Sequence, residues 1–225
     1  IYTRRHFPPE AKQRVDQMIE NLREAFGQSI DSLDWMTDDT KAAARQKLAL
    51  FTAKIGYPDE WQDYSDLAID PGDLVGNVRR VREFEHREAV AKLAKPVDRS
   101  EWGMTPQTVN AYYRATLNEI VFPAAILQPP FFDFDVDDAF NYGAIGAVIG
   151  HEFSHGFDDQ GRKFDGRGRL AAWWTDRDAP EYEARSAGLG QQYAEFSPLP
   201  ALTTHRDLPP AEHIADLPGL CIAYP

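Results

Sequence analysis

The stretch Asn141-Tyr-Gly-Ala-Ile-Gly-Ala-Val-Ile-Gly-His-Glu-Phe-Ser-His155 decides how this chain folds. It is apolar, rich in small residues and free of proline, so it predicts a buried helix over about residues 142–157, with Asn141 suited to the N-cap. Gly143, Gly146 and Gly150 would form a smooth strip on this helix that allows close packing against a neighbour. Since each glycine lowers helix propensity by up to about 1 kcal/mol relative to alanine, we expect tertiary packing to hold the helix in place.

The end of this stretch carries His151 and His155, with Glu152 beside the first of them. Residues four apart lie one above the other on a helix, so both imidazoles can reach one cation. This is the two-histidine half of a hydrolytic zinc site. Zinc held by three protein ligands keeps a position for water, whose pKa falls to about 7, and a nearby carboxylate can take a proton from that water. The sequence predicts that Glu152 is this general base.

A zinc site of this type needs a third protein ligand. In the metzincin pattern a third histidine would fall at position 161, but that residue is Gly161. The other common arrangement takes a glutamate from a later helix. Glu212 is favoured because Asp216 would share its helical face, so that one carboxylate could ligate while the other orients a ligand histidine. The alternatives that stay open are Glu181, Glu183 and Glu195 and, more weakly, His205 and His213.

Two β-rich runs precede the motif helix, Val109 to Tyr113 and Glu119 to Phe122, and they predict a hairpin. An exposed hairpin edge beside the zinc helix could add an extended peptide as another strand, with main-chain hydrogen bonds supplying affinity. An ordinary hairpin packed in the core is the alternative.

The chain before residue 100 is predicted to be helical. Val15, Met18, Ile19, Leu22 and Phe26 recur at helical spacing after Pro8-Pro9, and Thr37 followed by two aspartates marks a second helix start. A third helix is expected from about Asp73 to Lys95, with Leu74, Val78, Val81 and Phe84 on one face. We expect the apolar residues on these helical faces to be buried in the core. The fold class is therefore α+β and predominantly α-helical, with a helical region over 1–100 and the metal-binding part over 101–225.

Composition excludes several classes of protein. Hydrophobic residues make up 43% and charged residues 27%, and mean hydropathy is -0.51. No apolar run approaches the roughly 20 residues of a membrane span, so we expect no membrane segment within this chain. A net charge of -12 disfavours a nucleic-acid partner. With Cys221 as the single cysteine there is no internal disulfide, and the sequence carries no signal for an oligomeric state.

Several motifs, taken together and in order, resemble the neprilysin and endothelin-converting-enzyme family of zinc endopeptidases, in its bacterial branch. The similarity is dense from about residue 100 to 175 and looser before it. The motifs are Asn110-Ala111-Tyr112-Tyr113, the run from Glu119 to Phe132, Asn141 to Gly146, Val148 to Asp159, and Trp173-Trp174.

The resemblance implies a thermolysin-like zincin core and one zinc ion per chain. His151, His155 and Glu212 would bind the metal, and Glu152 would be the general base. Asp216 would support a zinc histidine and act as a proton donor. Asp158 would brace His155, because a carboxylate on the far ring nitrogen fixes a ligand's tautomer. The backbone of an oligopeptide substrate would be held by Asn110 and Ala111, and cleavage would fall on the amino side of hydrophobic residues.

The chain departs from this family towards its end. Ala211 and His213 replace the common glycine and asparagine around Glu212, residues 200–210 are dissimilar, and Pro218 is expected to interrupt the turn that follows Asp216. Because the chain starts without methionine and stops soon after Asp216, we expect a fragment whose catalytic domain is truncated at its C-terminus. A fragment that binds zinc or peptide without turnover is thus the alternative to an active endopeptidase. The resemblance favours a periplasmic or extracellular location, while the sequence leaves a cytoplasmic one open.

Overall fold

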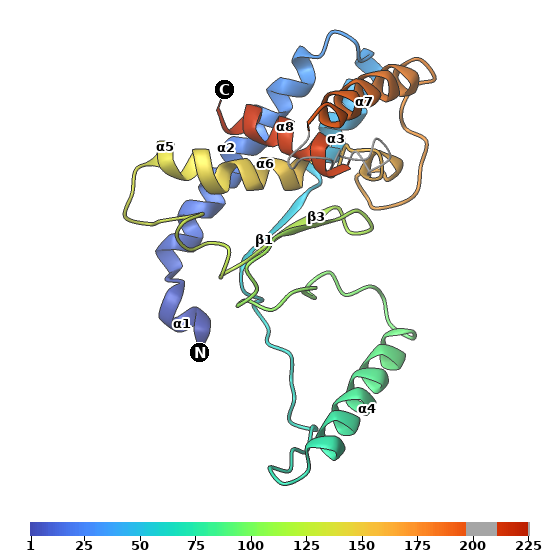
Figure 1. Ribbon diagram of the computed structural model, residues 1–225. Coiled ribbons are helices and arrows are strands. Elements are labelled where there is room, and N and C mark those ends of the chain that lie inside the picture. Colours follow the sequence, from blue (N-terminus) through green and yellow to red (C-terminus); the bar gives the residue numbers. More distant parts are fainter. Residues whose placement is uncertain (197–210, 225) are drawn as a thin grey trace. The chain divides into compact units, whose positions relative to one another are not determined.

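The computed structural model describes residues 1–196 and 211–224 of the 225-residue chain (Figure 1). The chain divides into two compact units, Ile1–Tyr57 together with Met104–Pro225, and Pro58–Gly103. Residue 100 lies in the second unit, while residues 1–57 fold with the part that carries the motif helix.

A strand that the sequence analysis missed joins residues 1–57 to that part. β1 (Thr52–Gly56) pairs in parallel with β3 (Glu119–Pro123), with Thr52 opposite Glu119 and Gly56 opposite Pro123. β2 (Tyr112–Arg114) pairs with the other side of β3 in antiparallel fashion, so the predicted hairpin is present and the strand order is β1-β3-β2. β3 is buried along its whole length, whereas β2 is an edge strand.

Three helices precede the sheet: α1 (Tyr2–His6), α2 (Pro9–Ser32) and α3 (Asp38–Ala49). Pro9 stands at the first position of α2, where its missing N–H costs no helical hydrogen bond. The stripe predicted for α2 is buried, with every member at most 6% exposed. Thr37 is the N-cap of α3, as expected, but its hydroxyl donates to the carboxylate of Asp178 rather than capping the helix.

The motif helix is longer at its start than predicted and contains a π-helical turn. It runs as α5 (Asp138–Asn141), the π-turn η1 (Tyr142–Gly146) and α6 (Ala147–Ser154). The amide of Ile145 donates to the carbonyl of Phe131, outside the helix, which accounts for the local widening. Asn141 is not the N-cap. Asp137 caps the helix by accepting from the amide of Phe140, while Asn141 is buried and bonds both the amide and the carbonyl of Asp133.

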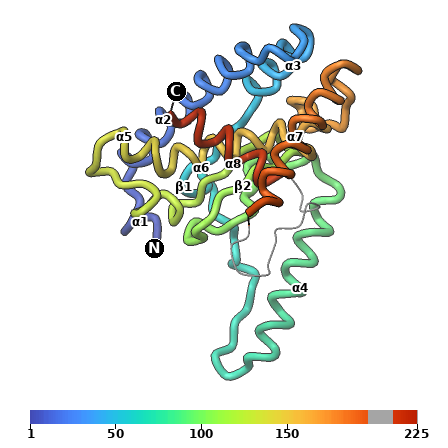
Figure 2. Tube along the Cα trace, turned by 45° about the horizontal axis from the view of Figure 1, so that its top comes forward, coloured from blue at the N-terminus to red at the C-terminus, as the bar shows by residue number. Residues whose placement is uncertain are grey.

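The chain after the motif helix forms a short 3-10 turn, η2 (Gly161–Lys163), and two helices, α7 (Asp178–Ala194) and α8 (Ala211–Ala223). α8 lies along α6 (Figure 2). Pro218 does not interrupt α8, which continues through it to Ala223. The proline removes one helical hydrogen bond, and packing against α6 holds the helix together despite that loss. In the described part of the chain, no helix combines the length and apolarity needed to cross a membrane.

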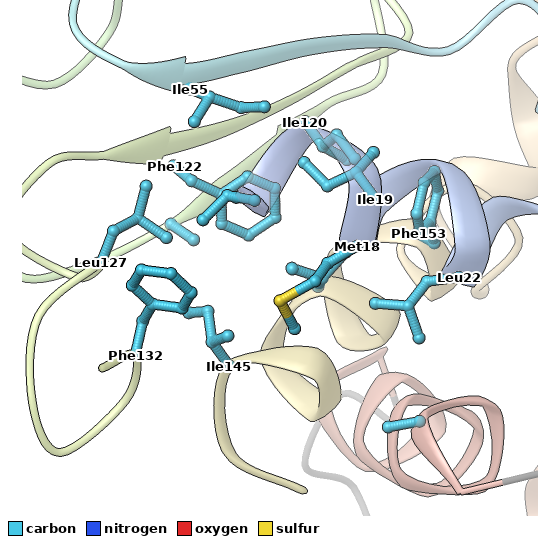
Figure 3. Close-up of a cluster of buried hydrophobic side chains, with 14 of the residues drawn as sticks. Met18, Ile19, Leu22, Ile55, Ile120, Phe122, Leu127, Phe132, Ile145 and Phe153 are labelled. Atoms are coloured by element: carbon cyan, nitrogen blue, oxygen red, sulfur yellow. The ribbon is translucent and has the colours of Figure 1, made fainter. Parts of the chain in front are cut away.

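The core of the first unit lies between the sheet, α2 and the motif helix. In Figure 3, Ile55, Ile120 and Phe122 from the sheet point towards Met18 and Ile19 of α2 and towards Ile145 and Phe153 of the motif helix. These side chains are at most 3% exposed. The core therefore holds the apolar side of the motif helix, and Ile222 and Ala223 of α8 join the same cluster. The wider cluster also includes Leu22, Leu127 and Phe132.

The second unit, Pro58–Gly103, contains α4 (Leu74–Lys92), which begins close to the expected Asp73 and is capped by the side chain of that residue. Its apolar stripe is buried only at Phe84, which is 5% exposed, while Leu74 is 77% exposed. The expectation that the whole stripe is core is wrong for this helix, because a single helix with flanking turns offers little apolar surface to cover it.

Candidate metal centre

The structure brings the two motif histidines and Glu212 to one point. Nε2 of His151 lies 3.4 Å from Oε2 of Glu212, and Nε2 of His155 lies 3.8 Å from the same oxygen. Ligand atoms of all three residues lie within 4.8 Å of one another. Glu212 comes from the first turn of α8 and the histidines from the end of α6, so packing of these two helices creates the cluster.

The donor set fits a small divalent cation. Ligand atoms that lie 2.0–2.1 Å from a tetrahedral zinc ion are about 3.4 Å apart, close to the separations found here. Two imidazole nitrogens and one carboxylate are also the ligands of many catalytic zinc sites. The imidazoles are largely buried, whereas the side chain of Glu212 is 69% exposed. The site is therefore open to solvent on the side of α8.

Each histidine is oriented by a carboxylate on its far nitrogen. Nδ1 of His151 is 2.7 Å from Oδ1 of Asp216, and Nδ1 of His155 is 2.8 Å from Oδ2 of Asp158. Both contacts turn Nε2 towards the shared point and favour a proton on Nδ1. Burial alone would lower the pKa of His155, but the hydrogen bond to Asp158 and the nearby carboxylates outweigh it and raise the pKa.

Glu152 lies beside this cluster in a nearly buried position, 5% exposed. Burial raises the pKa of its carboxyl to about 7, and Glu212 adds to the increase, while His155 and the amide of Tyr113 oppose it. A cation bound by the three neighbours would also lower this pKa, because it stabilises the charged carboxylate. Within the described residues Oε2 of Glu152 is buried and has no hydrogen-bond partner, and Glu152 is among the residues that line the cavity beside the cluster.

The strand edge predicted to bind substrate also lies at the cluster. Asn110 and Ala111 line a cavity of about 510 Å³ together with the two histidines and Glu152. Asn110 is exposed and Ala111 is buried. The edge strand β2 begins at the next residue, Tyr112, and the backbone amide of Tyr113 donates a hydrogen bond to the carboxyl group of Glu152. The remaining lining residues are Met104, Tyr112, Tyr113, Ala115, Asp158, Gln160, Gly161, Ala211 and Glu212.

The other candidates for the third ligand lie away from the cluster or outside the described residues. Glu183 forms an ion pair with Arg162, and the ring of His213 stacks on Tyr193 at a centroid distance of 3.7 Å. Glu181 and Glu195 do not join the metal-binding group formed by the described residues, and His205 lies outside them.

The sequence profile described as peptidase family M13 matches residues 110–225, and a second profile of that family matches residues 1–58. The chain belongs to peptidase family M13. Among M13 relatives, it is 38% identical over 234 residues to neprilysin from Homo sapiens, an alignment that covers 100% of this chain and 31% of the relative. The chain thus spans about a third of the length of the relatives it matches.

Solved structures give the same family. The Mycobacterium tuberculosis zinc metalloprotease Zmp1 in complex with an inhibitor is 56% identical with a TM-score of 0.90, covering 99% of this chain and 34% of that one. PepO from Lactobacillus rhamnosis is 31% identical with a TM-score of 0.93, covering 99% and 35% respectively. The predicted family and the predominantly helical α+β fold are confirmed by these M13 neighbours.

One residue near the centre was missed by the sequence analysis. Lys47 is 2% exposed and lies under the loop that follows the motif helix. Its spacing from Thr40, Ala44 and Leu48 places it on the buried face of α3, and a lysine on an otherwise apolar face is the signal that could have identified it.

Proposed function

We propose that this chain forms the metal-binding part of a zinc-dependent endopeptidase that holds one zinc ion through His151, His155 and Glu212. The observation that carries the proposal is the convergence of two imidazole nitrogens and one carboxylate oxygen. The nearby free oxygen of Glu152 adds the base that hydrolysis needs. A zinc ion bound there would supply Lewis-acid chemistry, lowering the pKa of water and polarising the carbonyl that is attacked.

Glu152 acts as the general base in this proposal. A base works best when its pKa lies near the working pH, and burial moves the pKa of Glu152 in that direction. Its carboxylate takes the proton from water, and the same carboxyl can then donate that proton to the leaving amine. Asp216 acts on Nδ1 of His151, and this contact supports a role in orienting that ring. A proton-donor role for Asp216 stays a prediction.

The substrate in this proposal is an oligopeptide in extended form. Asn110 and Ala111 stand where the backbone of a peptide laid along the edge of β2 would meet the cluster. Main-chain hydrogen bonds to a strand edge bind many sequences alike, so side-chain preference has to come from pockets beyond them. Cleavage on the amino side of hydrophobic residues is proposed from the family resemblance.

A second candidate is zinc or peptide binding without turnover. It is favoured by the exposure of the α8 carboxylates, since the side chains of Glu212 and Asp216 are 69% and 63% exposed. A carboxylate in water binds and orients its partners more weakly than one in a dry site.

Zinc content by atomic emission and cleavage of a quenched fluorescent peptide, with and without a chelator, separate the two candidates. The endopeptidase proposal expects chelator-sensitive cleavage, and Glu152→Gln should retain zinc but reduce the rate by about 10²–10⁴-fold. Glu181→Gln, on the exposed face of α7, is the matched control and should keep full activity. Stoichiometric zinc without cleavage by the unmodified chain would favour the second candidate.

A further inference from the structure

Lys47 forms a buried connection between α3 and the loop that follows the motif helix. Its Nζ donates to three backbone carbonyls, those of Gly156 at 2.5 Å, Gly161 at 2.8 Å and Phe164 at 2.7 Å. An ammonium group has three N–H donors, so the three acceptors match it completely. The side chain of Lys47 thus anchors the loop over residues 156–164, although it is more than 100 positions away in the sequence.

The same loop carries Asp158, the carboxylate that orients His155. Oδ1 of Asp158 accepts from the amides of Gln160 at 2.9 Å and Gly161 at 2.6 Å, which leaves Oδ2 for the imidazole. Gly161 therefore contacts both residues: its amide donates to the carboxylate of Asp158, and its carbonyl accepts from Nζ of Lys47. A movement of the Lys47 Nζ would be passed through this single residue to the carboxylate that contacts the metal ligand His155.

The charge of Lys47 acts on the same carboxylate. Asp158 is 3% exposed, so its carboxylate oxygens depend on hydrogen bonds from the protein rather than from bulk water. Burial lowers the pKa of Lys47 to about 7, while Asp158 and Asp165 oppose this by favouring its charged form. The rings of Phe157 and Trp173 lie 5.5 and 5.6 Å from its Nζ. In this water-poor surrounding the attraction is screened far less than at the surface.

We propose that Lys47 is a positioning residue for the metal centre: it holds the 156–164 loop so that Asp158 fixes the ring of His155 for metal binding. The proposal rests on the proposed function for the identity of the centre. Lys47 touches none of the three ligands. It acts through Asp158, and removing its ammonium should therefore loosen one metal ligand without changing the ligand set.

Zinc affinity, measured by competition with a chromophoric chelator on the full chain, tests this role. Lys47→Met should weaken zinc binding by up to about 10–100-fold, the effect of losing Asp158 as the partner of His155, because the position of Asp158 depends on Lys47. Lys41→Met is the matched control. Lys41 lies on the same helix and donates to one exposed carbonyl, that of Asp31, so its removal should leave zinc affinity unchanged. Equal affinity in Lys47→Met and the unmodified chain would overturn the proposal.

A merely structural lysine is distinguished by a double-mutant cycle. If Lys47 acts through Asp158, Asp158→Asn should itself weaken zinc binding, and adding Lys47→Met should then change it by less than about threefold. If Lys47→Met weakens zinc binding by the same factor with and without Asp158→Asn, the two residues act independently and the proposal is overturned. Should Lys47→Met fail to fold, Lys47→Gln keeps part of the hydrogen bonding and serves in the same cycle.

The ring of His155 provides a readout that needs no metal. In a nitrogen-resolved NMR spectrum of the metal-free chain, the neutral ring should carry its proton on Nδ1, and Lys47→Met should give a mixture of tautomers. An unmodified chain that binds no zinc would contradict the proposed function, but this spectrum would still decide whether Lys47 positions His155. An unchanged tautomer in the variant would count against it.

Discussion

Gly219 of α8 lies against Gly150 of α6 at a separation that leaves no room for a side chain on either residue. A Cβ added to Gly150 would come within 2.7 Å of the carbonyl oxygen of Gly219, and one added to Gly219 would come within 2.7 Å of the amide nitrogen of His151. This contact sets the spacing between the two helices that carry the candidate ligands. The position of Glu212 relative to the histidines therefore depends on the absence of a side chain at both Gly150 and Gly219.

Gly219→Ala should push α8 away from α6. We expect a loss of about 1–3 kcal/mol in the free energy of unfolding, the usual result of overpacking, together with weaker zinc binding because Glu212 moves with α8. Gly143→Ala is the control, since nothing lies within 4 Å of a Cβ there and alanine favours helix. Urea unfolding and chelator competition provide the two measurements. Unchanged zinc affinity in Gly219→Ala would contradict the role given to this contact.

Zinc should stabilise the fold, and Glu212 should be needed for that effect. A ligand present at 100 times its Kd raises the free energy of unfolding by about 2.7 kcal/mol. Thermal unfolding with zinc and with a chelator should show this difference in the unmodified chain and a much smaller one in Glu212→Ala. Glu181→Ala, the control, should behave like the unmodified chain. A full zinc response in Glu212→Ala would exclude this residue as the third ligand.

Lys54 neutralises a carboxylate inside the sheet. Its Nζ lies 2.7 Å from Oε2 of Glu119, whose side chain is 1% exposed. Lys54→Met should cost about 3 kcal/mol of unfolding free energy, because it leaves a buried charge without its closest partner. Arg79→Ala, which removes an exposed pair with Glu83 at 3.9 Å, should cost less than about 0.5 kcal/mol. Denaturant unfolding would measure both, and equal losses would show that burial does not matter here.

Asp178 should make the stability of the protein depend on pH in the acid range. Burial alone would raise its pKa, but hydrogen bonds from Thr37, Thr40 and Thr175 outweigh it and hold the pKa at about 2. Since this pKa is lower in the folded than in the unfolded chain, the stabilisation is present above about pH 4 and is lost as the pH falls through 2. Its size is about 2 kcal/mol.

Asp178→Asn should therefore lower the free energy of unfolding at pH 7 and leave it nearly unchanged at pH 2. Urea unfolding between these limits, compared with the unmodified chain and with the exposed Asp39→Asn, would show the difference. A loss of equal size at both ends would contradict the assignment to this carboxylate.

Local patterns in the sequence were sufficient for much of the fold. The stripe on α2 and the approximate bounds of α4 follow from helical periodicity. The close approach of Gly150 to a neighbour was expected from its missing side chain, although the partner, Gly219, could not be named. The arrangement of His151 and His155 likewise follows from a spacing of four residues on one helix.

Features that depend on distant partners could not be predicted in this way. β1 was missed because its partner, β3, lies more than 60 residues further along the chain. Asn141 has the side chain of an N-cap, yet Asp133 binds both of its amide atoms. The role of Lys47 depends on three carbonyls from a loop over 100 residues away. Each of these contacts is set by tertiary structure, for which local periodicity gives no signal.

The parallel pairing of β1 with β3 bears on how this protein could be divided. The two family profiles match separate stretches, yet the first of them supplies a strand to the sheet beside the second. A shortened chain that begins after residue 104 would leave β3 with an open edge along five buried residues, and such an edge invites pairing with another copy. The two stretches belong to one compact unit and should therefore be expressed together.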